Sequence, residues 1–190
     1  MERRRLPPSE PWFAELYERH FDFVWRTLRH LGVREADLAD ACQEVFLIVH
    51  RRYPSFDARA KVTTWIFQIC FNKARERRRS AHVRREVLGE AALDQARMPS
   101  DPFSELERQD KLALFEAALD AMELEQRAAF ILFEIEGMSG PEVAEALAVP
   151  LGTAYSRLRL AREAFQAAVA RVRLATAPVY PRKTRKSGAR

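Results

Sequence analysis

Glycine is scarce in this sequence, with only 6 in 190 residues, and alternating runs of valine, isoleucine and threonine are few. A sheet protein is built from such strands and from frequent turns, so both shortages argue against a sheet. Long stretches of alanine, leucine, glutamate and arginine instead favour helices. We therefore predict an all-α fold.

Only two cysteines occur, Cys42 and Cys70, and neither has a second cysteine or a histidine at metal-ligand spacing. This pattern disfavours a zinc site and indicates buried free thiols. The four histidines are scattered, no phosphate-binding loop is present, and no nucleophile accompanies a base and a carboxylate. We predict that the protein is not an enzyme and needs neither a cofactor nor a metal.

Long apolar runs are also missing: nowhere do about 18 apolar residues follow one another. The N-terminal sequence MERRRLPPSEPW lacks the apolar segment of a secretory signal. These absences predict a cytoplasmic protein without membrane insertion. The 32 lysines and arginines exceed the 27 acids and give a net charge of +5, which suits an anionic partner without identifying it.

Two regions show apolar residues at steps of three and four, and a segment of different composition separates them. In that segment, residues 86–110 carry seven acids against two arginines and no sustained apolar stripe, which is typical of a linker. The predicted organisation is a first helical domain, a flexible acidic linker, a second helical domain and a basic disordered tail, at residues 10–85, 86–108, 109–173 and 174–190.

The stretch GMSGPEVAEALAVPLGTAYSRL, residues 137–158, predicts a helix-turn-helix in the second domain. Gly137 suits a left-handed helix cap, Ser139 and Glu142 form a capping box, and Thr153 is the predicted N-cap of the next helix. In this motif the second helix enters the DNA major groove. A helical bundle without a role in DNA binding is the alternative that the stretch alone leaves open.

Taken together, the two regions resemble an extracytoplasmic-function sigma factor of the sigma-70 family, the smallest type of bacterial RNA polymerase promoter-specificity subunit. The resemblance rests on DLADACQEVFLIVHRR, FDARAKVTTWIFQICFNKARERRR and ALDAMELEQRAAFILFEIEGMSGPEVAEALAVPLGTAYSRLRLAREAF. It covers nearly all of residues 10–172, with both motif sets in the family's order. It implies a protein that binds core RNA polymerase, recognises the −35 and −10 promoter elements and helps to melt DNA without nucleotide hydrolysis.

The resemblance also assigns surfaces to residues. The polymerase-binding motif, which would meet the clamp helices of the largest polymerase subunit, falls on Asp37, Asp40, Gln43 and Glu44. The −10 element would meet a specificity loop at residues 53–60 and the helix after it, through Tyr53, Phe56, Asp57, Asn72, Lys73, Arg75, Arg77, Arg78 and Arg79. The −35 element would meet the second helix of the helix-turn-helix, through Thr153, Tyr155, Ser156, Arg157, Arg159 and Arg162.

Residue chemistry supports these roles and leaves some alternatives open. An asparagine such as Asn72 can hydrogen-bond a base edge, and the arginines after it suit phosphates. The acidic residues could instead form an ordinary solvated face, and Phe56 could be a core residue. For Trp65 we favour the core over a wedge at the duplex edge, because it shares an apolar stripe with Ile69.

The resemblance further implies an anti-sigma factor that holds the protein inactive, and contact with the flap tip of the second-largest polymerase subunit near Phe115, Phe130 and Phe133. Those phenylalanines are more simply explained as core residues. Two rival functions remain open here. One is a DNA-binding regulator whose first half senses a ligand or dimerises, and the other is a protein-interaction adaptor whose basic residues serve solubility.

Overall fold

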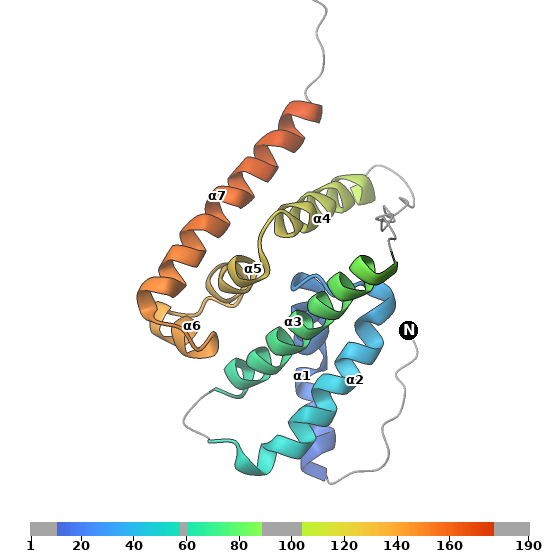
Figure 1. Ribbon diagram of the computed structural model, residues 1–190, viewed down its shortest axis with the longest axis vertical. Coiled ribbons are helices and arrows are strands. Elements are labelled where there is room, and N and C mark those ends of the chain that lie inside the picture. Colours follow the sequence, from blue (N-terminus) through green and yellow to red (C-terminus); the bar gives the residue numbers. More distant parts are fainter. Residues whose placement is uncertain (1–10, 58–60, 89–103, 177–190) are drawn as a thin grey trace, which may run out of the picture.

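The computed structural model describes residues 11–57, 61–88 and 104–176, with side chains described at residues 11–57, 61–80 and 112–171. Every regular element in these ranges is helical (Figure 1), which confirms the predicted all-α fold with two helical domains. Most of the predicted linker, the end of the predicted tail and residues 58–60 of the predicted specificity loop lie outside the described residues.

The first domain contains α1 (Pro11–His30), α2 (Glu35–Arg52), a short 3-10 turn η1 (Tyr53–Ser55) and α3 (Val62–Leu88). Its helices bury one apolar face each, with Leu28, Phe46 and Phe67 among the fully buried side chains. The three long helices therefore form a bundle in which α3 packs against both α1 and α2.

The second domain contains α4 (Ser104–Asp120), α5 (Leu124–Phe130), a π-helical turn η2 (Ile131–Ile135), α6 (Gly140–Ala146) and α7 (Leu151–Thr176). Helices α6 and α7 form the predicted helix-turn-helix. Gly137 adopts a φ of 63°, and the capping box of Ser139 and Glu142 is present, so both predicted signals at the start of this motif are confirmed.

The predicted N-cap of the second helix of this motif is wrong. Thr153 is not an N-cap, because α7 begins at Leu151 and the backbone amide of Thr153 donates a 2.9 Å hydrogen bond to the carbonyl of Pro150. Thr153 therefore already lies in the first turn of α7, which begins two residues before the predicted start. Helix α4 begins at Ser104, within the predicted linker, because leucine, glutamate, arginine and glutamine form helices readily without an apolar stripe.

The two domains pack against each other, which the sequence did not predict. One buried hydrophobic cluster contains Ile66 and Phe67 of α3 together with Leu124 of α5 and Leu147 after α6. Figure 1 shows α3 between α2 on one side and α6 on the other. The chain therefore joins the two helical domains through a shared apolar core in addition to the linker.

Polar contacts extend this junction at the end of α1. Arg29 forms an ion pair with Glu116 of α4, and the His30 ring meets the Phe115 ring edge-on at 5.7 Å. Next to them, the buried Arg127 of α5 lies so close to Gly32 that a Cβ at this glycine would overlap the guanidinium. The described junction thus combines apolar burial, charge pairing and a close backbone approach.

Candidate nucleic-acid interface

Helix α3 divides its residues between the core and a polar face. Ile66, Phe67 and Cys70 are buried, while Asn72, Arg75 and Arg79 are exposed. Steps of three and four residues place these exposed side chains on one side of the helix. None of the three has a hydrogen-bond or ion-pair partner among the described residues. Their donors are therefore available to an external acceptor.

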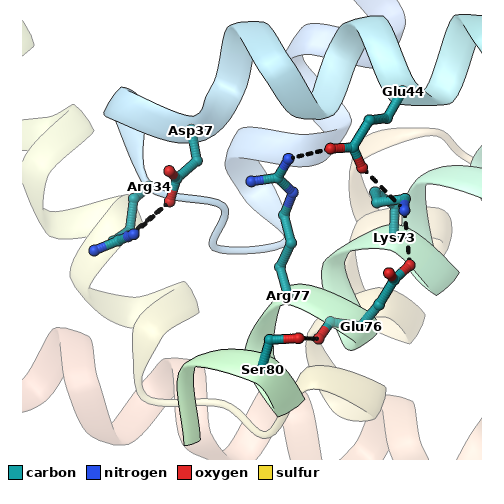
Figure 2. Close-up of polar contacts among 7 residues, drawn as sticks. All are labelled: Arg34, Asp37, Glu44, Lys73, Glu76, Arg77 and Ser80. Carbon is teal, nitrogen blue, oxygen red and sulfur yellow. Dashed lines mark hydrogen bonds and ion pairs between the residues drawn. The ribbon is translucent and has the colours of Figure 1, made fainter. Parts of the chain in front are cut away.

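Other basic residues of α3 already have partners within the chain (Figure 2). Lys73 lies 2.9 Å from Glu44 and 2.7 Å from Glu76, and Arg77 lies 2.8 Å from Glu44. The hydrogen bond with Glu76 raises the pKa of Lys73 the most. Burial alone would raise the pKa of Glu44, but Lys73 and Arg77 outweigh it and lower that pKa. Lys73 and Arg77 are thus fixed against α2 and largely neutralised.

The predicted polymerase-binding residues do not form one uniform surface. Asp37 pairs with Arg34 at 2.7 Å, and Glu44 points toward α3 (Figure 2). Asp40 and Gln43 are exposed on α2. Of the four predicted residues, only Asp40 and Gln43 both face solvent and have no ion pair with another described residue.

Four aromatic side chains gather where α1, η1 and α3 meet. The Tyr53 ring stacks on Trp12 with centroids 4.7 Å apart and planes inclined by 13°, and it stacks on Phe56 at 6.1 Å. Phe56 in turn contacts Trp65 at 4.9 Å. All four rings are half-buried. Trp65 packs against the core and is partly buried, and Phe56 is also partly buried. The predicted alternatives, core or contact with DNA, therefore both stay open for these two residues.

Trp12 is the member of this aromatic cluster that sequence reasoning missed. It stands among apolar residues three and four apart along α1, which is typical of a core position, but in the structure it covers Tyr53 at the edge of the core. No local signal separates a core aromatic residue from one that stacks at a surface, because both satisfy the same helical period. The predicted loop residue Asp57 lies beside the cluster in sequence and is exposed.

The second helix of the helix-turn-helix, α7, carries aromatic, hydroxyl and ion-paired side chains on its exposed surface. Tyr155 is exposed by 49% while its ring rests on Phe133 at 5.7 Å. The Ser156 hydroxyl donates to the carbonyl of Thr153 at 2.9 Å. Arg159 pairs with Glu163 at 2.6 Å, and Arg162 pairs with Glu134 at 2.5 Å. These exposed ion pairs are weak and can exchange for phosphate contacts.

The two predicted DNA-binding helices meet across one open cavity of about 410 Å³. Gln68, Asn72 and Arg75 of α3 line one side, and Arg157 of α7 and Glu125 of α5 line the other. Arg75 and Arg157 have no ion-pair partner among the described residues. The structure thus brings Asn72 and Arg75, predicted to contact the −10 element, to the same cavity as Arg157, predicted to contact the −35 element.

Three polar contacts flank this cavity along α3. Lys61 lies 2.7 Å from Glu142, the Gln68 amide donates to the backbone carbonyl of Glu145 at 3.0 Å, and Arg78 lies 3.4 Å from Glu123. The hydrogen bond from Lys61, followed by those from Ser139, lowers the pKa of the Glu142 carboxyl to about 2. Glu142 therefore stays ionised at neutral pH and keeps its charge opposite Lys61.

Other kinds of site find no support in the described part of the chain. Within it, no group of three histidine, cysteine or acidic side chains is placed to hold a metal ion. Cys42 and Cys70 are buried free thiols, and burial raises the pKa of Cys42 to about 12. Among the described helices, none has the length and apolar content needed to cross a membrane.

Comparisons with known proteins agree with this geometry. Residues 16–84 match the family described as Sigma-70 region 2, and residues 112–165 match Sigma-70, region 4. The RNA polymerase sigma factor NccH of Alcaligenes xylosoxydans xylosoxydans is 31% identical over 84% of this chain and 88% of its own length. The ECF RNA polymerase sigma factor SigE of Mycolicibacterium smegmatis is 34% identical over 80% of this chain and 60% of its own length.

The fold is also similar to solved structures. The sigma factor RpoE of Bartonella quintana, solved in complex with the anti-sigma factor NepR, superimposes with a TM-score of 0.71 at 20% identity. The match covers 85% of this chain and 98% of the RpoE chain. At this level of identity, the similarity shows a common arrangement of helices.

Proposed function

The chain belongs to the extracytoplasmic-function group of the sigma-70 family of RNA polymerase sigma factors, and from this we propose how its own residues direct promoter-specific transcription initiation. The first domain binds core polymerase and the −10 element, and the second binds the −35 element. The observation that carries the proposal is the pair of helices α3 and α7, each of which presents basic and hydrogen-bonding side chains outward. Joining two weak DNA sites in one chain raises the overall affinity.

In the first domain, Asn72 reads a base of the −10 element, and Arg75 and Arg79 bind backbone phosphates. Their exposure and their lack of partners among the described residues support this division. Lys73 and Arg77 contribute less to DNA binding, because Glu44 already holds and largely neutralises them. Arg78 becomes available once it leaves Glu123.

Melting uses the aromatic cluster of Trp12, Tyr53, Phe56 and Trp65. Extruding a base from the duplex costs a few kcal/mol, and stacking on an aromatic ring returns about 1–3 kcal/mol per base. The half-buried rings support such a role because each keeps part of its surface open to solvent. Asp57 supplies an acceptor for the edge of the captured base. No nucleotide hydrolysis and no catalytic residue are needed.

In the second domain, Thr153, Tyr155, Ser156 and Arg157 lie in the first two turns of α7 and face the −35 bases, while Arg159 and Arg162 bind phosphates. Position near the N-terminus of the second helix supports the base-reading role. Phe133, half-buried beneath Tyr155, offers apolar surface to the polymerase flap tip.

On α2, the exposed Asp40 and Gln43 bind the polymerase clamp helices, with Asp37 joining them on release of Arg34. RpoE of Bartonella quintana was solved with the anti-sigma factor NepR, and we propose that an anti-sigma factor also controls this protein in the cytoplasm. Such a partner blocks the surfaces that polymerase and DNA would use.

In vitro transcription with core polymerase on a genomic promoter library tests the function. Promoter-specific transcripts are expected only when this protein is added. Asn72→Ala should lose about 1–3 kcal/mol of discrimination at one −10 position. Arg79→Ala should instead weaken binding to all sequences alike and lower the salt dependence by about one phosphate contact.

Two results would contradict this assignment. Unchanged base preference in Asn72→Ala would remove the base-reading role. Tight, sequence-specific DNA binding by the free protein, with no need for core polymerase, would favour an ordinary DNA-binding regulator.

A further inference from the structure

Gly140 is a glycine that the backbone conformation does not require. It is the first residue of α6, it is buried, and its φ lies outside the left-handed region that Gly32 and Gly137 occupy. A residue with a side chain can adopt this conformation, and glycine is a poor helix former. The reason for a glycine at this position therefore lies in the space around it.

The space beside Gly140 is filled by Tyr155 of α7. A Cβ added at position 140 would overlap the Tyr155 hydroxyl oxygen and would lie 2.6 Å from its Cζ, with Cδ1 of Leu151 at 3.2 Å. Carbon atoms in contact lie about 3.5–4.0 Å apart, so the tyrosine ring cannot keep its place beside even an alanine. The two helices of the helix-turn-helix thus meet at the tip of one tyrosine ring.

A second contact holds the same ring from η2. The Phe133 ring lies beside it, with centroids 5.7 Å apart and planes inclined by 31°. Tyr155 is nevertheless 49% exposed, and its hydroxyl has no hydrogen-bond partner among the described residues. The ring is therefore held by two neighbours, while about half of it faces solvent on the helix that the proposed function assigns to the −35 element.

We propose that Gly140 and Phe133 are positioning residues, which fix the direction in which Tyr155 presents its ring and hydroxyl to the −35 element. A side chain that is already held loses little conformational freedom on binding, so its base contact is stronger and more selective. Gly140 is buried and touches no base itself. The inference rests on the proposed role of α7, and it adds that a missing side chain on the first helix of the motif sets part of the base preference.

Gly140→Ala tests the positioning role. Its methyl group should displace the tyrosine ring and not the backbone, because the capping box of Ser139 and Glu142 holds the start of α6 and the ring ends a flexible side chain. The matched control is Gly152→Ala in the first turn of α7, where no atom lies within 4 Å of an added Cβ. Both variants add the same group to the same motif.

The first measurement is NMR of the free protein labelled at glycine. The sequence has 6 glycines, so the spectrum holds few signals, and the Gly140 signal is identified by its loss in Gly140→Ala. This signal should shift in Tyr155→Ala, because an aromatic ring changes the magnetic field at its neighbours. The Gly32 signal, from the first domain, should stay in place. An unchanged Gly140 signal would overturn the contact.

The second measurement is transcription by core polymerase with each variant, on a promoter from the genomic library whose −35 element has been randomised. Gly140→Ala should lose about fivefold of its discrimination at one −35 position, the lower end of the value of a base contact, and should keep its −10 preference. Gly152→Ala should keep both preferences. Unchanged −35 preference in Gly140→Ala, or an equal loss in both glycine variants, would overturn the proposal.

A double-mutant cycle shows whether the effect passes through Tyr155. In Tyr155→Ala the methyl group of Gly140→Ala has no ring to displace, so it should cause no further loss of discrimination. A further loss would contradict the positioning role.

Phe133→Leu tests the second support independently, and it keeps the test decisive if Gly140→Ala folds poorly. The substitution removes the ring beside Tyr155 and retains an apolar side chain. It should lower discrimination at the same −35 position as Gly140→Ala or Tyr155→Ala. Unchanged discrimination, or a loss at another position only, would contradict the role of Phe133 in holding Tyr155.

These outcomes are separate from failure of the proposed function. The NMR contact needs neither polymerase nor DNA, so it can be present or absent whether or not the protein initiates transcription. Absence of promoter-specific transcription with the wild-type protein would contradict the proposed function and leave the contact as measured. Active transcription with an unchanged −35 preference in Gly140→Ala would contradict the positioning role alone.

Discussion

Glu44 is a predicted polymerase-binding residue that the structure also places in ion pairs within the chain. Its place on the acidic side of α2 suggested a contact with polymerase, but it binds Lys73 and Arg77 of α3. The Lys73 side chain is only 13% exposed, so loss of Glu44 would leave a largely enclosed cation paired with Glu76. Glu44 thus positions α3 on α2, whereas Asp40, four residues earlier, is exposed.

The matched substitutions Glu44→Gln and Asp40→Asn separate these roles. Glu44→Gln should lower the free energy of unfolding by about 1 kcal/mol, a modest value because the glutamate is partly exposed to solvent. Asp40→Asn should leave stability unchanged and weaken binding to core polymerase several-fold. Urea unfolding and a fluorescence binding assay with core polymerase would measure the two effects. The opposite pattern would return Glu44 to the polymerase-binding surface.

The contribution of Glu44 should also depend on pH. Its pKa is lowered in the folded protein, so the stabilisation is fully present above the ordinary value of 4.5. It is lost as the pH falls through the lowered pKa of the folded state. The stability difference between wild type and Glu44→Gln should therefore vanish in acid.

At the scale of the elements, the glycine that follows α1 also leaves room for a side chain of α5. Gly32 has a φ of 86° and follows the end of α1. Arg127 of α5 then packs where a side chain at this position would lie, and it pairs with Asp120 at 3.1 Å. Burial lowers the pKa of Arg127, because it disfavours the charged guanidinium. The enclosed guanidinium therefore depends on its ion pair with Asp120 and on close packing against Gly32.

Gly137 provides a control for this fit, because it has a φ of 63° but no atom within 4 Å of an added Cβ. Gly137→Ala should cost roughly 1 kcal/mol for backbone strain alone. Gly32→Ala should cost more, because the Arg127 guanidinium must also move. In a double-mutant cycle, Gly32→Ala should cost less when Arg127→Ala is present. Urea unfolding measures the loss in free energy of unfolding caused by Gly32→Ala with and without Arg127→Ala. Equal losses would show that the close approach of Arg127 to Gly32 does not affect stability.

At the scale of the molecule, the shared hydrophobic cluster couples the stability of the two domains. All three tryptophans, Trp12, Trp25 and Trp65, lie in the first domain. Their fluorescence therefore reports on that domain alone, while circular dichroism reports on helices of both. A domain junction that buries apolar residues such as Phe67 and Leu147 predicts one cooperative unfolding transition.

A substitution in the second domain can test this coupling. Leu119 is 2% exposed and lies in a small cluster of that domain, so Leu119→Ala should cost about 2–5 kcal/mol. Tryptophan fluorescence and circular dichroism should both move to a lower midpoint. The control Leu160→Ala, at a residue 40% exposed, should move neither. An unchanged tryptophan transition in Leu119→Ala would mean that the domains unfold independently.

Periodicity and capping residues determined much of this protein from the sequence alone. The spacing of apolar residues predicted two helical regions, and Gly137 with the Ser139–Glu142 box predicted the helix-turn-helix, because these signals act within one or two turns of chain. The motifs of both regions also predicted the family. The exact start of α7 was missed because Pro150 and Thr153 are both able to begin a helix.

Tertiary structure alone decided which charged and aromatic side chains are free. Lys73 and Asn72 are neighbours on one basic helix, yet one is bound to Glu44 and the other is exposed. Trp12 covers Tyr53, and Glu142 faces Lys61 across 81 positions of sequence. Such pairings depend on how helices distant along the chain pack together, and helical spacing within one segment carries no information about its partner.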